Sequence, residues 1–287
     1  MPNRGLFVGL VTLDLIYLAE SAPGNNQKIV ASDYTVAAGG PATNAAVTFS
    51  YLGNQATLLA MLGSHPMTQL IKGDLENYNV ANFDLGSSIE PPPVSSIIIT
   101  ESTGDRAIIS INAVKTQCIS ESIPEDILQN VDIVMIDGHQ MKVGEATARK
   151  AQLKNIPVVI DGGSWKAGFE QLLPLVDYAI CSENFYPPGC HNSQEVVNYL
   201  HTIGIPHIAI THGEKPIEYF WGEKTGIVEV PNIQPVDTLG AGDIFHGAFC
   251  HYILQSSFRD ALLKAANIAS KSCRFFGTRR WMDDRIF

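Results

Sequence analysis

The chain has 287 residues, 45% of them hydrophobic and 17% charged, which is enough for one large domain with a substantial core. Its net charge of −10 argues against a nucleic-acid partner, because a phosphate backbone binds to basic surfaces. No apolar run reaches the length of a membrane span, and the five widely spaced cysteines contain no CxxC pair. The cysteine pattern favours reduced thiols in a cytoplasmic protein over a disulfide framework or a zinc site.

Six β-rich runs follow one another along the chain, and a helical pattern follows most of them. These runs are Leu6–Leu10, Ala56–Ala60, Asp132–Ile136, Pro157–Ile160, Asp177–Cys181 and His207–Thr211. The first run imitates a secretory signal, but Asp14 lies in the same apolar stretch, where a signal carries no charge. We therefore interpret it as a strand. The repeated alternation predicts an α/β fold in which a parallel sheet carries helices on both faces.

Two segments, roughly residues 15–37 and 94–112, break this alternation because they contain β-like or irregular runs without helical patterns between them. Such segments suit a small flap of strands that projects from the main sheet. Edge strands of the main sheet are the alternative, and periodicity does not decide between the two.

Polar residues follow several predicted strands, at the sheet edge where parallel α/β proteins bind ligands. They are Asp137, Asp161, Ser182, Glu183, Thr211 and His212. Polar loops and helix caps explain any one of them, but the row as a whole predicts a cleft. The eight histidines show no metal-ligand spacing, and we interpret them as structural or surface residues.

The stretch "AAGGPATNAAVTFSYLG", residues 37–53, runs from a glycine turn into a predicted helix. Gly39 and Gly40 allow a small ligand to approach the backbone, and Asn44 offers a donor and an acceptor that suit a hydroxyl group. Asp14, which trails the first strand, supplies another acceptor.

The stretch "DTLGAGDIFHGAF", residues 237–249, also passes from glycines into a helix, so bare N–H groups at Gly240, Ala241, Gly242 and Asp243 are expected to bind an anion. Losing one such donor typically costs an enzyme about 3 to 4 kcal/mol of transition-state stabilisation. Asp243 is either a helix N-cap worth about 1 kcal/mol or a base that accepts a hydroxyl proton. The helix dipole is expected to lower the pKa of Asp243 and make it a weak base, which phosphoryl transfer tolerates.

These two stretches resemble the first and second signatures of the PfkB, or ribokinase-like, carbohydrate kinases, and "ITHGE" and "AANIASKSC" fit the same order. The resemblance covers nearly the whole chain. It implies a three-layer α/β/α sandwich with a mainly parallel sheet and a small β-strand lid. The chain would then be a single domain, residues 1–287, whose lid is formed by the segments near 15–37 and 94–112.

The resemblance also implies ATP- and Mg²⁺-dependent phosphorylation of a hydroxyl on a sugar or sugar-like substrate, with Asp243 as the catalytic base. The other matching positions fall into four groups, namely the anion hole, the substrate hydroxyls, the nucleotide side and a monovalent cation such as K⁺. In that order they are Gly240, Ala241 and Gly242; Asp14, Gly39, Gly40 and Asn44; Thr211, Gly213 and Asn267; and Asp237, which corresponds to a cation ligand in potassium-activated members. Ser182 and Lys166 are also assigned to the nucleotide side, although the usual family residues are absent there, and Lys166 could still meet a phosphate.

Two departures from the family pattern leave the substrate open. "SENF", Ser182 to Phe185, stands where many members have Asn-x-x-Glu ordering magnesium-bound water, and Pro41 offers no side-chain donor. A nucleoside kinase of the same fold and a non-catalytic sugar- or nucleotide-binding regulatory protein are the alternatives. Family members often form homodimers through the lid, but Ile97, Ile98 and Ile99 fit a core as well as an interface.

Overall fold

The computed structural model describes residues 1–86, 89–111, 118 and 123–283, so Asn112, the last residue of the second predicted lid segment, lies outside the described residues. Within these residues the main sheet has nine strands in the order β13-β12-β11-β10-β9-β8-β1-β4-β5, all parallel except for antiparallel β12 and β13. The strands are β1 (Arg4–Gly9), β4 (Gln55–Ala60), β5 (Val80–Asp84), β8 (Ile133–Ile136), β9 (Val158–Gly162), β10 (Tyr178–Ser182), β11 (His207–His212), β12 (Lys215–Trp221) and β13 (Lys224–Val228). Each of the six predicted runs is one of these strands.

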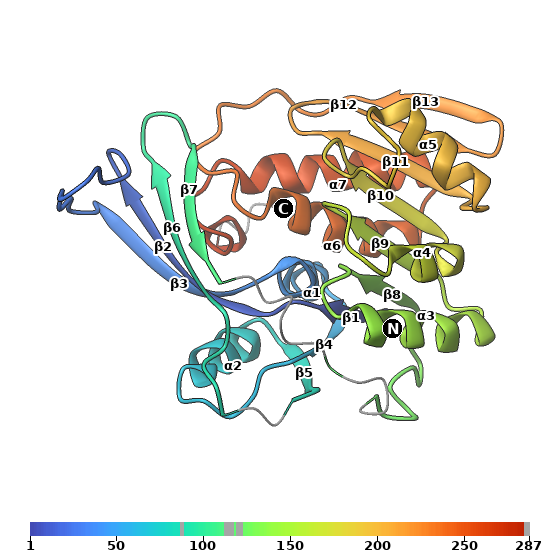
Figure 1. Cartoon of the computed structure of the whole chain (residues 1–287), viewed down its shortest axis with the longest axis horizontal. Helices are drawn as coiled ribbons and strands as arrows, with labels where there is room; N and C mark the ends of the chain where they lie inside the picture. Colours follow the sequence, from blue (N-terminus) through green and yellow to red (C-terminus); the bar gives the residue numbers. More distant parts are fainter. Residues whose placement is uncertain (87–88, 112–117, 119–122, 284–287) are drawn as a thin grey trace.

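Helices cover both faces of this sheet, so the predicted three-layer α/β/α architecture is confirmed (Figure 1). One core contains α1 (Pro41–Tyr51), α2 (Thr68–Asn77), α6 (Ala241–Ile253) and α7 (Phe258–Ser272). The other contains α3 (Met141–Leu153), α4 (Phe169–Leu172) and α5 (Ser193–Thr202). Side chains of β1 alternate between the two cores, with Phe7 in the first and Leu6 and Val8 in the second. None of the helices in the described ranges is long and apolar enough to cross a membrane.

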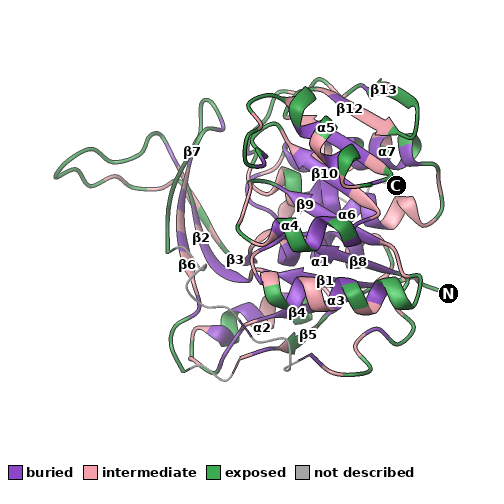
Figure 2. Ribbon diagram, turned by 45° about the vertical axis from the view of Figure 1, so that its right-hand side comes forward, coloured by how far each residue is buried: buried purple, intermediate pink, exposed green. Residues whose placement is uncertain are grey.

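The two segments that break the alternation form a separate four-stranded sheet in the order β3-β2-β6-β7, so the edge-strand alternative is wrong. Its strands are β2 (Thr12–Ala19), β3 (Asp33–Gly39), β6 (Val94–Thr100) and β7 (Arg106–Ser110). Figure 2 shows this small sheet projecting from the main body, with exposed loops at its tip. Ile97 and Ile99 are buried in a cluster with Ile16 and Phe276, so these two isoleucines are core residues.

The strand order places a topological switch point between β1 and β8. From β1 the chain builds β4 and β5 on one side and later adds β8 on the other. Ligands of open α/β sheets bind at the carboxyl end of such neighbours. Asp137 follows β8 directly at this point, and a Cβ added to Gly9 at the end of β1 would lie only 2.0 Å from its carboxylate.

Candidate active site

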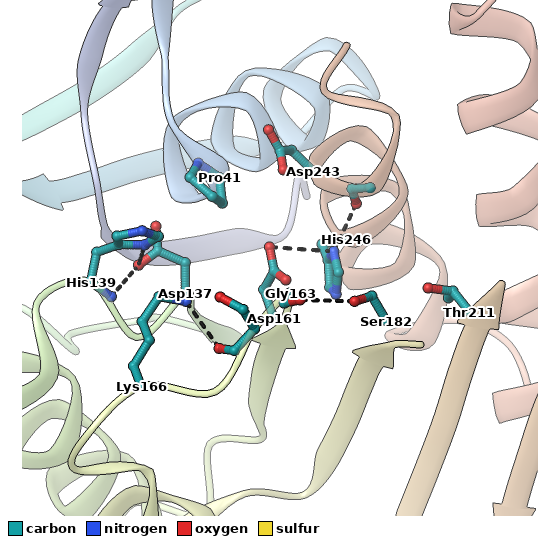
Figure 3. A pocket seen from close by; sticks show the side chains of 12 residues that line it. Pro41, Asp137, His139, Asp161, Gly163, Lys166, Ser182, Thr211, Asp243 and His246 are labelled. Carbon is teal, nitrogen blue, oxygen red and sulfur yellow. Dashed lines mark hydrogen bonds and ion pairs between the residues drawn. The ribbon is translucent and has the colours of Figure 1, made fainter. Parts of the chain in front are cut away.

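A cavity of about 260 Å³ lies at the carboxyl ends of the central strands, as the row of polar residues predicts (Figure 3). Its lining comes from the starts of two helices, from the last residues of β9 to β11 and from the segments that follow β8 and β9. The helix starts supply Pro41 from α1 and Gly242, Asp243 and His246 from α6. The strand ends supply Asp137, His139, Asp161, Gly163, Ser164, Lys166, Ser182 and Thr211. The cavity therefore collects carboxylates, hydroxyls and a lysine from segments far apart in the sequence.

Asp243 lies in the first turn of α6, but it does not cap the helix. The N-cap is Gly240, and the Oδ2 atom of Asp243 instead accepts a hydrogen bond of 2.8 Å from Nδ2 of Asn44. Burial of the carboxyl group, followed by the nearby charge of Asp161, raises the pKa of Asp243 to about 7. Both the cap alternative and the expected low pKa are therefore wrong. Desolvation outweighs the helix dipole, and a carboxylate with this pKa is well suited to accept a proton near neutral pH.

The start of α6 is open toward the cavity. Gly240 has a φ of 70°, and nothing lies within 4 Å of a Cβ added to Gly242. Within the described part of the chain, the N–H groups of Gly242 and Asp243 have no hydrogen-bond partner, whereas that of Ala241 donates to the carbonyl of Thr238 at 3.3 Å. One fewer N–H group is free than predicted, because that of Ala241 already donates a hydrogen bond to Thr238.

The start of α1 is already occupied by a carboxylate of the protein itself, that of Asp137. Oδ2 of Asp137 accepts hydrogen bonds from the N–H groups of Leu10, at 2.8 Å, and Ala42, at 3.1 Å, while Oδ1 accepts one from the N–H of His139. Burial alone raises the pKa of Asp137, but the His139 side chain and these N–H donors outweigh it, so the pKa is lowered. Asp137 therefore occupies this helix start as a buried, ionised carboxylate.

Gly39 and Gly40 are required by contacts inside the protein. A Cβ on Gly39 would lie 1.9 Å from Oδ2 of Asp14, and one on Gly40, whose φ is 100°, would lie 2.4 Å from the carbonyl oxygen of Leu10. Asp14 is buried in β2, accepts a hydrogen bond from Thr12, and has a pKa raised by burial. The glycine turn thus packs against Asp14 at the base of the small sheet. Contacts of these residues with a substrate stay a prediction.

Asn44 is buried in α1, and its two side-chain atoms have different partners. Nδ2 donates to Asp243, and Oδ1 accepts a hydrogen bond of 2.9 Å from Nη1 of Arg279. Arg279 is not predicted from the sequence, and no local pattern indicates it because it lies 235 positions from Asn44. His246 is not predicted either, although its position three residues after Asp243 places both on one helical face. Nδ1 of His246 lies 2.7 Å from the carbonyl of Gly242 and 3.7 Å from Asp161.

The residues predicted for the nucleotide side divide into two groups. Ser182, Thr211 and Lys166 line the cavity, whereas Gly213 and Asn267 are exposed and do not. The Ser182 hydroxyl donates to the carbonyl of Gly163 at 2.8 Å (Figure 3). The nucleotide-side roles of all five residues stay predictions.

The "SENF" departure has a packing explanation. Phe185 is buried in an aromatic cluster, with ring centroids 5.5 Å from Trp165 and 5.4 Å from Phe169. Glu183 points elsewhere and lies 3.3 Å from Nδ1 of His212. The position that the resemblance matches to a magnesium-ordering glutamate is therefore part of the core in this protein.

Asp237 holds two loops together outside the cavity lining. Its carboxylate accepts hydrogen bonds of 2.8 Å from the N–H groups of Leu239 and Gly277. Burial raises its pKa. A monovalent cation at Asp237 stays a prediction.

The fold and the cavity together define a class of protein, an α/β protein whose cavity places a buried carboxylate beside the open start of a helix. The profile of the pfkB family carbohydrate kinases matches residues 4–285, and the chain belongs to this family. It is therefore a phosphotransferase with an alcohol group as acceptor.

The chain is similar to characterised sugar kinases along most of its length. It is 23% identical to the ribokinase of Bacillus subtilis, over 97% of this chain and 95% of that protein. It is 25% identical to the deoxyribokinase of Salmonella typhi, over 90% of this chain and 88% of that protein. The solved structure of Arabidopsis thaliana ribokinase, complexed with ribose and ATP, superposes with a TM-score of 0.77 at 23% identity and covers 96% of this chain and 94% of its own.

Proposed function

We propose that this protein transfers the terminal phosphoryl group of ATP to a hydroxyl group of a sugar or sugar-like alcohol. The observation that carries the proposal is the start of α6, where Asp243, with a pKa of about 7, adjoins the unpaired N–H groups of Gly242 and Asp243. A base and an anion-binding site then lie in one turn of helix. The similarity to ribokinases and a deoxyribokinase supports a sugar as the acceptor.

In the proposed reaction the ionised Asp243 accepts the proton of the acceptor hydroxyl. The hydroxyl oxygen uses its electron pair to form a bond to the γ-phosphorus, and the bond from that phosphorus to the β–γ bridging oxygen breaks. ADP leaves with the electron pair of the broken bond on its terminal oxygen. The N–H groups at the start of α6 stabilise the negative charge on the transferring group, the kind of preorganised contact that dominates phosphoryl transfer.

Mg²⁺ fits this site as a companion of the ATP phosphates. The described residues contain no group of three or more His, Cys, Asp or Glu side chains arranged to hold a metal ion. Magnesium usually keeps several waters and binds through substrate phosphates with few protein carboxylates. Asp161, a carboxylate of the cavity that accepts no hydrogen bond from a backbone N–H of the described residues, is suited to hold a water of such an ion. When bound, Mg²⁺ neutralises charge on the phosphates.

The small sheet is proposed to act as a lid over the acceptor. It contacts the segment before α6 and the segment after α7, since Arg106 of β7 donates to the carbonyl of Thr238 at 3.2 Å and Phe276 packs against its isoleucines. A closed lid excludes water and limits hydrolysis of ATP. The lid boundaries, a homodimer formed through the lid and a cytoplasmic location stay predictions.

The experiment is an ADP-release assay over pentoses, hexoses, sugar phosphates and nucleosides, with Asp243→Asn beside the native protein. We expect one acceptor class to support turnover, and Asp243→Asn to lose at least about a thousandfold in kcat, because it keeps the shape but not the base. Asp260→Asn, the same change at an exposed position of α7, is the control.

The native kcat/KM is expected to fall as the pH drops below about 7, because protonated Asp243 accepts no proton. Near-native turnover by Asp243→Asn on the selected acceptor would refute the base assignment. A requirement for a base on the acceptor would identify a nucleoside kinase. Thermal stabilisation by sugars or ATP without ADP formation would support a binding protein instead.

A further inference from the structure

Arg279 lies at the centre of a buried polar network that joins three distant parts of the chain. It belongs to the segment after α7, and its side chain is only 9% exposed. Its Nε and Nη2 atoms donate to Oδ2 of Asp74 in α2 at 3.2 and 3.1 Å, and Nη2 also donates to the carbonyl of Ala38 in β3. Nη1 donates to Oδ1 of Asn44 in α1. One planar guanidinium group therefore connects α2, β3 and α1.

The chemistry of this network allows a single orientation of the Asn44 amide. A guanidinium group has donors only, so the atom that faces Arg279 must be the oxygen of the amide. The NH₂ group then faces Asp243 at 2.8 Å. We propose that Arg279 is a positioning residue for the catalytic base, because it holds the Asn44 amide so that it always donates to Oδ2 of Asp243. This inference rests on the proposed role of Asp243.

The fixed amide determines which oxygen of Asp243 receives the proton. Oδ2 already accepts a hydrogen bond from Asn44, whose NH₂ group cannot accept one in return. Within the described residues, this is the only hydrogen bond to the Asp243 carboxylate. Oδ1, which accepts no hydrogen bond from the described residues, is therefore the more basic oxygen and the one that takes the proton of an acceptor hydroxyl. An amide free to rotate would instead offer its oxygen to protonated Oδ2 and stabilise the wrong form of the base.

Other charged groups around Asp243 act in parallel with this network. Asp161 and Asp137, at the ends of β9 and β8, raise its pKa, and His246 of α6 lowers it. Arg279 contacts none of these three groups, so its influence through Asn44 can be measured separately. If Arg279 only stabilised the fold, its replacement would lower thermal stability and leave the titration of Asp243 where it is.

The test is the pKa of Asp243 in the free protein, followed by NMR of the carboxyl carbons of ¹³C-labelled aspartate. The signal is assigned by its absence in Asp243→Asn. In Arg279→Lys the positive charge remains but the planar fork is lost, and we expect the pKa of Asp243 to rise by about one unit, a tenfold change in proton binding. Arg279→Met, which removes every donor, is expected to raise it at least as far.

Two further variants separate positioning from general loosening. Asp74→Asn removes the ion pair with Arg279 but not the contact with Asn44, so the thermal midpoint should fall while the pKa of Asp243 stays unchanged. Asn44→Ala should raise the pKa, and adding Arg279→Lys to it should raise it no further, because the effect passes through the amide. If Arg279→Met does not fold, the Arg279→Lys and Asn44→Ala pair carries the test.

The proposal is overturned if folded Arg279→Lys leaves the pKa of Asp243 unchanged, if its effect adds fully to that of Asn44→Ala, or if Asp74→Asn shifts the pKa equally. The activity of Asp243→Asn is a separate outcome. If that variant phosphorylates its acceptor at the native rate, Asp243 is not the catalytic base. The titration experiment still reports whether Arg279 orients Asn44 toward Asp243.

Discussion

Both α1 and α6 begin after a glycine turn, but the first helix start is filled by a side chain of the protein and the second is open. Both follow glycines with positive φ, 100° at Gly40 and 70° at Gly240, and both face the same cavity. The protein fills the first start with its own carboxylate, Asp137, and leaves the second open at Gly242. A helix start binds an anion only where the fold has not already supplied one. The first glycine turn therefore has a structural role, and the second is the one at which we propose chemistry.

Among changes to the glycines of the two helix starts, the largest effect is expected from removing a donor at the open start. Gly242→Pro deletes one N–H in the first helical turn, where proline is tolerated, and should lower kcat about a hundredfold with little change in the thermal midpoint. Gly242→Ala keeps the N–H and meets no atom within 4 Å, so it should lose much less. Equal losses in steady-state assays of the two variants would mean that the N–H is not the functional group.

At the closed start the expected effect is on stability. Gly40→Ala places a Cβ 2.4 Å from the carbonyl oxygen of Leu10 at a φ of 100°, and should cost about 3 kcal/mol in urea unfolding. Gly53 at the other end of the same helix is a matched control, because its φ of 90° is similar and nothing lies within 4 Å. Gly53→Ala should cost only about 1 kcal/mol. If the two variants were equally destabilised, the contact with Leu10 would have no importance.

The smallest expected effects are on the pH dependence of stability, and they have opposite signs for Asp137 and Asp243. The lowered pKa of Asp137 means that its ionised form stabilises the fold above its ordinary pKa of 3.8, and this contribution is lost as the pH falls below that value. Asp137→Asn should therefore cost about 2 kcal/mol at pH 7 and less near pH 3. The raised pKa of Asp243 means that ionisation destabilises the fold increasingly from about pH 4 to 7.

Asp243→Asn should accordingly gain about 1 kcal/mol above pH 7 and nothing near pH 4. Thermal unfolding of both variants across this pH range measures the two signs. A loss of stability at pH 8 in Asp243→Asn would contradict the raised pKa, and a gain in Asp137→Asn would contradict the filled start of α1.

Several features of the site could be predicted from local sequence. The β-rich runs and helical patterns predicted the parallel sheet, because burial on both faces leaves continuous apolar runs. The polar residues after those runs predicted the cavity, in which Asp137, Asp161, Ser182 and Thr211 meet. The glycines before α6 predicted an open helix start, since backbone conformation depends on the residues at that position.

The sequence by itself therefore determined the sheet, the two helix starts and the acid beside the second of them, because periodicity and glycine turns act over a few residues. Only the tertiary structure decided what each start does. Asp137 reaches α1 from 95 positions away and Arg279 reaches Asn44 from 235. The pKa of Asp243 likewise depends on burial and on Asp161, not on its own helix. Desolvation and long-range hydrogen bonds exist only once the chain has folded, and they make one glycine turn a structural joint and the other a candidate catalytic centre.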